Sequence, residues 1–490
     1  NIFIHPNEKE CLKNGVLATF PAGHSDDQAD AQREKIRDYL SEAGKTNIRY
    51  DAERYVLSFM GTVPDDMAIE GYQTFLLVHP NNLGEHTRHN SELGFSGTQQ
   101  LEPEVIGMLG DLHGDPAVDG YLSSGGTEAN IQGCWVGREW LINHFAGDKD
   151  NRVCLLVTQF YHYSVAKAYH VLRLDGGFVK LPTDNKQRAV LVPEMEKEIR
   201  RRYDEGQRRF IIVAVAGSTL FGSVDDVAAI GEMMTRLENE YNTDQPASRH
   251  IGLYLHVDAA FGGFVAPFLP NPINIGFAHE RVSSMSIDPH KMGLIPYPAG
   301  AFLCCEGLIE LVGRPVDYVG GHRDVTLCGS RPGAAAAACW AGMTMLGRRG
   351  YEAKVRRCME VLRYAEGRLS ELKGIRLFTP TLNILAFAVL DQRFNQMLEH
   401  LDTAEKNGLR YDRDLPPDFP QDYRQLAETY RQLQDQYILV SASAPSDPRD
   451  VKSAPERIIR FVLMPHPWLL DKGERVFNDF LAKFRTLFSE

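Results

Sequence analysis

The sequence predicts an α/β protein built on a parallel sheet that is buried on both faces. Short, almost continuously apolar segments alternate with helix-like segments from about residue 101 onward. Such strands belong to sheets covered by helices on both sides, because a half-exposed strand alternates apolar and polar residues. Ligands bind these sheets beyond the carboxyl ends of the strands. Residues that follow strands are therefore the first candidates for a site.

The composition sets limits on the class of protein. The chain has 490 residues, 43% of them hydrophobic and 24% charged, which is typical of a globular protein of two or three domains. The net charge of −12 argues against nucleic-acid and anionic-membrane partners, which require basic surfaces. No apolar run approaches the roughly 18 residues of a membrane span.

The eight cysteines show no Cys-x-x-Cys pair and no His/Cys cluster with zinc spacing. We therefore expect no metal site, and reduced thiols in a cytoplasmic protein.

Residues 1–90 are expected to form an N-terminal arm. Helical patterns cover residues 31–43 and 65–78, and the breaker cluster at residues 79–84 predicts an exposed turn. The segment has too little apolar content for a domain of its own, so we expect it to pack against a partner subunit.

Residues 91–350 form the expected large domain. Apolar strands are predicted at residues 120–123, 153–158, 210–216, 253–257 and 282–287. Helices are predicted between them at residues 104–112, 127–145, 164–171 and 227–241.

An Ala-rich helix at residues 333–346 and a second long helix at residues 351–372 lie around the expected boundary near residue 350. A small C-terminal domain, residues 351–490, is predicted from strands at residues 382–389 and 458–464 among charged helices. The polar stretch 403–437 is interpreted as a surface insertion.

Lys291 is the residue around which the remaining motifs are arranged. It closes the segment Ser-Ile-Asp-Pro-His-Lys, between an expected strand and an apolar run that Gly and Pro interrupt. A lysine in apolar surroundings is costly to keep charged, so desolvation is expected to lower its pKa toward that of a reactive amine. A lysine that forms a Schiff base needs this property; a turn lysine without a catalytic role is the alternative.

Three further features follow expected strands. Residues 123–130 open a long helix whose free N–H groups and dipole suit a phosphate, unless Ser124 or Thr127 caps the helix. His162 can stack on a flat ring or be an ordinary satisfied polar residue. Asp258 needs a cationic partner when buried, either a protonated pyridine nitrogen or an ordinary salt bridge.

Together these features supply what pyridoxal phosphate requires: a phosphate site, a stacking group, an acid for the ring nitrogen and a Schiff-base lysine. On the motifs Ser-Gly-Gly-Thr-Glu-Ala-Asn (124–130), His-Val-Asp-Ala-Ala (256–260) and Asp-Pro-His-Lys (288–291), the sequence resembles the group II pyridoxal-phosphate-dependent amino-acid decarboxylases. The resemblance implies an aspartate-aminotransferase-like (fold type I) large domain with a mostly parallel seven-stranded sheet. It also implies a smaller C-terminal α/β domain and a homodimer with its sites near the interface.

The resemblance assigns roles to individual residues. Lys291 is the lysine that binds the cofactor covalently, His162 stacks on its ring, and Asp258 pairs with the pyridine nitrogen. Asp288 stands where some relatives carry Asn. The remaining cofactor contacts implied are Gly126, Thr127 and His290 on the phosphate side, Thr219 near the 3-hydroxyl, and Ala260 against the ring.

The implied reaction releases CO2 and a primary amine from an L-amino acid. The substrate amine displaces Lys291, and the electrons of the broken bond flow into the cofactor ring. The negative charge of Asp258 raises the pKa of the ring nitrogen and keeps it protonated. A general acid must then protonate the carbon. Tyr297 and Tyr318 are the candidates, since family members use a loop tyrosine that often reaches the neighbouring subunit's site.

The run Asp-Pro-His-Lys-Met-Gly-x-Ile-Pro-Tyr looks closest to bacterial tyrosine decarboxylases, so tyrosine or another aromatic amino acid is the leading substrate. His79 lies in a turn that borders the substrate pocket in relatives. Arg460 is either a partner of the substrate carboxylate or a plain strand-end charge.

Other functions remain open. Glutamate and aspartate decarboxylases share the same core. The run Gly-Ser-Arg-Pro-Gly-Ala (329–334) is similar to sphingosine-phosphate lyases, which cleave a carbon–carbon bond. A cofactor-binding protein without catalysis is a third possibility.

Overall fold

The structure is a computed structural model. It describes residues 29–487, apart from gaps at 46, 49, 51–53, 85–92, 146–150, 317–322, 407–414, 416, 446 and 451–454. The chain divides into two compact units. The larger unit comprises Leu57–Val389 and Leu439–Phe477, and the smaller one comprises the described parts of Asn1–Val56, Leu390–Ile438 and Asn478–Glu490.

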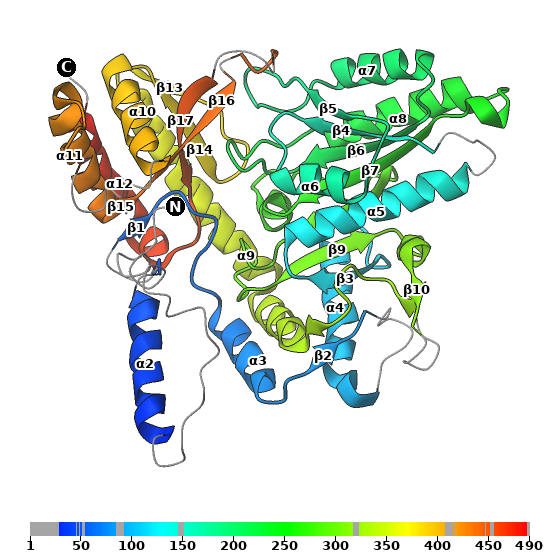
Figure 1. The fold of residues 1–490 in the computed structure, drawn as a ribbon, viewed down its shortest axis with the longest axis horizontal. Coiled ribbons are helices and arrows are strands. Elements are labelled where there is room, and N and C mark those ends of the chain that lie inside the picture. Colours follow the sequence, from blue (N-terminus) through cyan, green and yellow to red (C-terminus); the bar gives the residue numbers. More distant parts are fainter. Residues whose placement is uncertain are drawn as a thin grey trace. The chain divides into compact units, whose positions relative to one another are not determined.

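A seven-stranded sheet forms the centre of the larger unit (Figure 1). Its strands, in spatial order, are β3 (Asp119–Ser123), β9 (Gly300–Cys304), β8 (Val282–Ile287), β7 (Gly252–Ala259), β6 (Arg209–Val215), β4 (Val153–Thr158) and β5 (Phe178–Leu181). Neighbouring strands are parallel, except that β9 runs antiparallel to both β3 and β8. The predicted α/β fold with a mostly parallel seven-stranded sheet is confirmed.

Helices cover both faces of this sheet (Figure 1). One face carries α5 (Gly126–His144) and α6 (Tyr163–Val171), and the other carries α7 (Val192–Asp204) and α8 (Val227–Asn242). Right-handed crossovers between parallel strands place the helices in this way. The strands β4, β6 and β7 are buried along their whole length, which explains their continuously apolar sequences.

Two strands of the sheet were not predicted. β5 lies at the edge and is only partly buried, so its short sequence Phe-Val-Lys-Leu lacks the apolar signal of an inner strand. β9 is fully buried, but it lies within the apolar run that Gly and Pro interrupt.

The rest of the larger unit packs around α9 (Gly333–Ser370), which Gly347 interrupts with a non-helical backbone. A Cβ at Gly71 would lie 2.8 Å from the carbonyl oxygen of Ala337, so glycine allows α3 to approach α9 closely. The other elements are α3 (Asp66–Leu76), α4 (Ser96–Leu112), the paired strands β2 (Asn81–Asn82) and β12 (Arg331–Pro332), the paired strands β10 (Arg314–Pro315) and β11 (Arg323–Asp324), and a four-stranded antiparallel sheet of β13 (Ile375–Leu377), β14 (Ile384–Val389), β17 (Pro455–Val462) and β16 (Val440–Pro445).

The smaller unit contains α2 (Ala29–Lys45), α10 (Gln392–Lys406), α11 (Gln421–Gln436) and the parallel pair β1 (Tyr55–Val56) and β15 (Tyr437–Ile438), while α12 (Pro467–Phe484) belongs to both units in sequence. The interpretation of residues 403–437 as a surface insertion is wrong. α11 buries Ala427, Tyr430 and Leu433, whose helical spacing among polar residues makes an amphipathic face. The domain limits 1–90, 91–350 and 351–490 stay a prediction.

The described residues include seven cysteines, none of them in a disulfide. Burial raises the pKa of the Cys134 and Cys154 thiols to about 12, so they are unreactive at neutral pH. Among the helices that the structure describes, none has the length and apolar character required to span a membrane.

Candidate active site

The predicted site residues meet at the carboxyl edge of the parallel strands. A cavity of about 300 Å³ opens beyond β7 and β8, and it is lined by Ser124, Gly125, Gly126, Thr127, Asn130, His162, Ala260, Asp288, His290 and Lys291. A smaller cavity of about 20 Å³ shares His162, Ala260 and Lys291 and adds Thr219 and Asp258. The structure thus brings together all the residues expected to contact the cofactor.

Helix α5 lies along β7 at unusually short range. Alternate residues of β7 face this helix, as does Ala260 directly after the strand, and glycines on α5 make room for Tyr254, His256 and Ala260. A Cβ at Gly137 would lie 2.7 Å from the Tyr254 ring, and one at Gly126 would lie 2.9 Å from the Ala260 Cβ. The small residues therefore set the distance between the helix and the strand on which Asp258 lies.

The N-terminus of α5 has the geometry expected of a phosphate cradle. Its N-cap, Gly125, makes no side-chain capping hydrogen bond. Ser124 does not cap the helix; its N–H and its Oγ both donate to Glu128 at 2.8 Å. A Cβ at Gly125 would lie 3.2 Å from His290, which closes the other side. Backbone N–H groups at a helix N-terminus beside glycines suit a phosphate.

Asp258 is buried, with only hydrogen-bond donors around its carboxylate. Oδ2 accepts from Asn130 Nδ2 at 2.8 Å, and Oδ1 accepts from the Ala260 N–H at 3.2 Å. The Ser286 hydroxyl lies 3.3 Å from Oδ1. A carboxylate held by donors in this way is placed to pair with a protonated ring nitrogen.

Lys291 pairs with Asp288, and the expectation of a lowered lysine pKa is wrong. Its Nζ lies 2.8 Å from Asp288 Oδ2. Burial favours a lower pKa for Lys291, but the nearby carboxylate of Asp288, aided by Asp258, outweighs burial and raises it. The sequence showed the apolar surroundings but not that the turn directs Asp288 back onto the lysine.

His162 and His290 are both held in the neutral form by their surroundings. Burial lowers the pKa of each ring, and the neighbouring carboxylates only partly oppose this effect. His162 Nδ1 lies 2.8 Å from Ser164 Oγ. His290 stacks on the Tyr297 ring, with 4.0 Å between ring centroids. A neutral imidazole can stack on a cofactor ring without adding a positive charge.

Comparison with known proteins agrees with this geometry. The family described as the pyridoxal-dependent decarboxylase conserved domain matches residues 97–387, which is more than half of the chain. The chain belongs to this family.

Individual relatives are similar to this decarboxylase over about 70% of its chain. A probable L-tyrosine/L-aspartate decarboxylase from Methanocella arvoryzae is 35% identical over 359 residues, covering 73% of this chain and 85% of the relative. A tryptophan decarboxylase from Clostridium sporogenes is 29% identical, covering 70% of this chain and 81% of the relative.

Solved structures share the fold at low sequence identity. A sphingosine-1-phosphate lyase from Burkholderia pseudomallei has a TM-score of 0.70 at 17% identity, covering 98% of this chain and 95% of the other. Glutamate decarboxylase from Lactobacillus brevis has a TM-score of 0.68 at 19% identity, covering 96% and 95%. The protein is a pyridoxal-phosphate-dependent amino-acid decarboxylase.

The residues of the cavity fit this cofactor. The glycine cradle at the start of α5 could hold the phosphate, Asp258 could pair with the ring nitrogen, and Lys291 supplies the amine. When bound, pyridoxal phosphate accepts the electrons of the bond that is broken.

Two predicted residues lie away from these cavities, and one cannot be placed. His79 ends the turn after α3 and is exposed, with a left-handed backbone (φ 54°). Tyr297 is 63% exposed and stacks on His290 at the edge of the site. Tyr318 lies outside the described residues.

Arg460 does not line the cofactor cavities, but its side chain binds the backbone of Thr219, which does. One guanidinium nitrogen donates to the carbonyl oxygen of Thr219 and the other to that of Ser58. Burial lowers the pKa of Arg460 to about 10, so the side chain keeps its charge at neutral pH.

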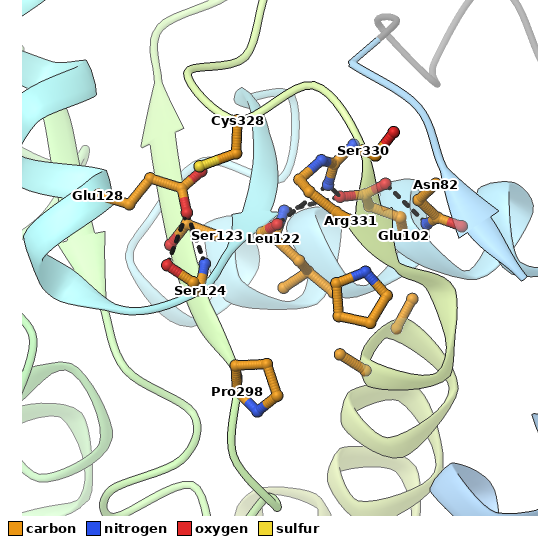
Figure 2. A pocket seen from close by; sticks show the side chains of 13 residues that line it. Asn82, Glu102, Leu122, Ser123, Ser124, Glu128, Pro298, Cys328, Ser330 and Arg331 are labelled. Atoms are coloured by element: carbon orange, nitrogen blue, oxygen red, sulfur yellow. Dashed lines mark hydrogen bonds and ion pairs between the residues drawn. The ribbon is translucent and has the colours of Figure 1, made fainter. Parts of the chain in front are cut away.

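A second cavity, of about 150 Å³, adjoins the cradle and shares Ser124 with it (Figure 2). Figure 2 shows Glu128 and Cys328 on one side and the group Arg331, Glu102 and Asn82 on the other. Arg331 forms a buried ion pair with Glu102, which also accepts from Asn82 Nδ2 at 2.9 Å. The remaining walls are mainly apolar: Leu122, Pro298, Pro332, Ala335 and Ala336.

Sequence reasoning missed the residues that support the site. Asn130 was quoted only as the end of a motif, although it lies one turn after Gly126 on the face of α5 that meets β7. Glu102 and Arg331 are far apart in sequence, so no local pattern could predict their ion pair.

Proposed function

We propose that this decarboxylase acts on tyrosine or another aromatic L-amino acid. The observation that carries the proposal is the second cavity, whose apolar walls adjoin the cofactor cradle. A flat, largely apolar side chain suits such walls, with hydroxyl groups at Ser123, Ser124 and Ser330 for a polar tip. The name of the tryptophan decarboxylase relative supports an aromatic substrate, while the tyrosine/aspartate decarboxylase relative is named for one aromatic and one acidic substrate.

Acidic and phosphorylated substrates suit this cavity less well. The cation in its wall, Arg331, already forms an ion pair with Glu102, and Glu128 adds a second carboxylate. A glutamate, aspartate or phosphate group placed here would be desolvated beside negative charge without a free cation. The same charges count against a sphingosine-phosphate-lyase-like reaction.

In the proposed reaction the chain's own residues have separate tasks. Lys291 would hold the cofactor through its amine, and Asp258 would pair with the ring nitrogen. Arg460 is the candidate partner of the substrate carboxylate, since it donates a hydrogen bond to the carbonyl oxygen of Thr219, which lines the smaller cavity beside Asp258. Tyr297 or Tyr318 donates the proton to carbon.

Mutation can decide whether Tyr297 or Tyr318 is the proton donor. Tyr297→Phe and Tyr318→Phe are each compared with the wild type, and the proton donor is the one whose removal lowers kcat by about 10²-fold or more. An unchanged kcat in both variants contradicts the assignment.

We further propose that the decarboxylase is a cytoplasmic homodimer. The consecutive residues Leu76, Leu77 and Val78 are 56%, 94% and 67% exposed, next to the turn at His79. Such a run is costly to leave in water, and a second copy of the chain would cover it. Light scattering coupled to gel filtration tests this: an active monomer contradicts it. The unpaired thiols support a reducing compartment, which localisation of a tagged chain would test.

The substrate is tested by incubating the cofactor-loaded protein with each of the twenty amino acids and measuring CO2 and amine. We expect release from tyrosine, phenylalanine or tryptophan and little from glutamate or aspartate. The variant Ala335→Phe fills the second cavity and should raise KM for the aromatic substrate while leaving cofactor absorption unchanged. Release from glutamate alone contradicts the proposal.

A further inference from the structure

Asn130 is a buried amide that uses its full hydrogen-bonding capacity. Its Nδ2 donates to Asp258 Oδ2 and to Ser164 Oγ, each at 2.8 Å. Its Oδ1 accepts from Ser286 Oγ at 2.7 Å and lies 2.9 Å from His256 Nε2. The side chain is only 1% exposed, so water does not compete for these bonds. Both amide hydrogens and both carbonyl lone pairs therefore have partners.

These partners fix the direction in which the amide points. A reversed amide would place Oδ1 against the carboxylate of Asp258, which has no hydrogen to donate. His256 is fully buried, and burial lowers its pKa to about 4, so its ring is neutral. Its Nδ1 lies 2.8 Å from Ser284 Oγ, whose hydroxyl can donate to it. The proton of His256 is then on Nε2, directed at Asn130.

The same reasoning extends from Asn130 to His162. Ser164 Oγ accepts from the amide, so its own hydrogen is free to go to His162 Nδ1 at 2.8 Å. The backbone N–H of Ser164 also donates to Nδ1, at 3.3 Å. With two donors on Nδ1, the neutral ring of His162 carries its proton on Nε2.

We propose that Asn130 is a positioning residue that orients Asp258 and favours one tautomer of His162 together, through one buried amide. Because its Nδ2 serves both, the carboxylate of Asp258 is held in place for the ring nitrogen while the Ser164 hydroxyl is turned toward His162, which favours the Nε2–H tautomer for stacking. Asn130 needs no contact with the substrate for this role. The inference rests on the cofactor assignment and does not depend on the identity of the substrate.

The charged groups around His162 act alongside this amide. Asp258 and Asp288 favour its protonated form, while burial, Lys291 and Lys167 favour the neutral form. None of these charges selects a tautomer, since they act on the ring as a whole. The tautomer is therefore selected by the two donors on Nδ1, which are the Ser164 hydroxyl that Asn130 orients and the backbone N–H of Ser164.

The decisive variant is Asn130→Asp, which keeps the shape and the acceptor but turns Nδ2 into an oxygen. That oxygen would face Asp258 at the distance of a hydrogen bond, so the two carboxylates must share a proton. Asp258 then protects the proton of the ring nitrogen less well. In the protein loaded with pyridoxal 5′-phosphate, the pH at which the cofactor absorption titrates should shift by about one unit or more, and the cofactor should dissociate about tenfold more readily.

The matched control is Gln132→Glu, the same chemical change on the same helix. Gln132 is also buried, but its Nε2 donates to the carbonyl oxygen of Val325 at 2.8 Å, away from the cofactor. We expect its cofactor titration and affinity to remain close to those of the wild type. If Asn130→Asp does not fold, Asn130→Ser takes its place, because one hydroxyl can serve Asp258 or Ser164 but not both.

A third variant distinguishes the bond from Asn130 to Asp258 from the bonds that lead through Ser164 to His162. Ser164→Ala removes the hydroxyl bond to His162 but keeps the backbone N–H on Nδ1, and it leaves Asn130 bonded to Asp258, so the cofactor titration should not move. The reaction of His162 with diethyl pyrocarbonate, mapped by mass spectrometry, should change its pH profile.

The proposal is overturned if Asn130→Asp titrates like Gln132→Glu, or if Ser164→Ala shifts the cofactor titration equally. A wild-type protein without visible cofactor absorption would instead overturn the site assignment itself.

Discussion

The two buried carboxylates of the site, Asp258 and Asp288, have opposite surroundings. Asp258 receives donors on both oxygens and contacts no cation among the described residues. Asp288 faces Lys291 through Oδ2, while its buried Oδ1 has no hydrogen-bond partner among the described residues. Asp258 is therefore fixed by the fold, whereas Asp288 is balanced by the charge of one movable amine. A carboxylate that must hold a cofactor charge and one that must respond to a lysine need these different environments.

Removing the amine should have the largest effect. Lys291→Ala takes away the cation that faces Asp288 and the group that binds the cofactor covalently. We expect decarboxylation to fall by about 10³-fold or more and the visible cofactor absorption to disappear. Spectra and amine release of the loaded variant check this. An unchanged spectrum contradicts the role of Lys291.

Replacing Asp258 and Asp288 by asparagine, one at a time, should lower kcat by different amounts. Asp258→Asn removes the charge that protects the ring proton, so kcat should fall by about 10²-fold while the cofactor still attaches to the protein. Asp288→Asn should reduce kcat less, because Asp288 acts on the lysine rather than on the ring. Steady-state kinetics on both variants test the order; the reverse order of losses counts against it.

Acid should lower the free energy of unfolding, in part through His256, which is bonded to Asn130 in the network around Asp258. His256 and His113 are buried with pKa values lowered to about 4. Unfolded histidines titrate near 6.5, so each destabilises the fold as the pH drops from 6.5 to 4, by up to about 3 kcal/mol. Asp225, whose pKa burial raises to about 6, favours the fold at low pH and opposes part of this loss.

Thermal melts of the cofactor-free protein between pH 7 and pH 4 measure the acid effect. The variant His113→Phe should lose part of the pH dependence without touching the active site. A melting temperature that does not change below pH 6 contradicts the neutral state of both histidines.

The smallest predicted effect concerns the lysine pKa. In Asp288→Asn the carboxylate that raises the pKa of Lys291 is gone, and burial then favours a lower value. We expect the pKa to fall, so that more of the amine is in its free form near neutral pH. The pH dependence of the rate at which the cofactor-free protein takes up pyridoxal phosphate measures this. A rate profile identical to that of the wild type contradicts it.

Local patterns predicted the inner strands and the residues at their ends, because burial on both faces leaves a continuous apolar signal. β4 and β6 carry this signal most clearly, and the residues that follow the strands led to Asp258 and Lys291. The edge strand β5 carries no such signal. The pairing of Asp288 with Lys291 depends on how one turn folds back, and the apolar flanks alone suggested the wrong direction for the lysine pKa.

The hydrogen bonds and ion pairs that hold the site residues in place could not be predicted from the sequence, because they join segments far apart in the chain. His256 meets Asn130 across 126 positions of sequence, and Arg331 meets Glu102 across 229. Each residue taken alone looks like an ordinary polar residue in a helix, strand or loop. Only the folded chain, which places α5 against β7 and β12 beside α4, shows that these residues are partners.

The most direct test of the site is to reduce the cofactor-loaded protein with borohydride, digest it and locate the pyridoxyl group by mass spectrometry. We predict that the group lies on the peptide that contains Lys291. A label on another lysine near the site, such as Lys167 or Lys180, would contradict the assignment of the active site.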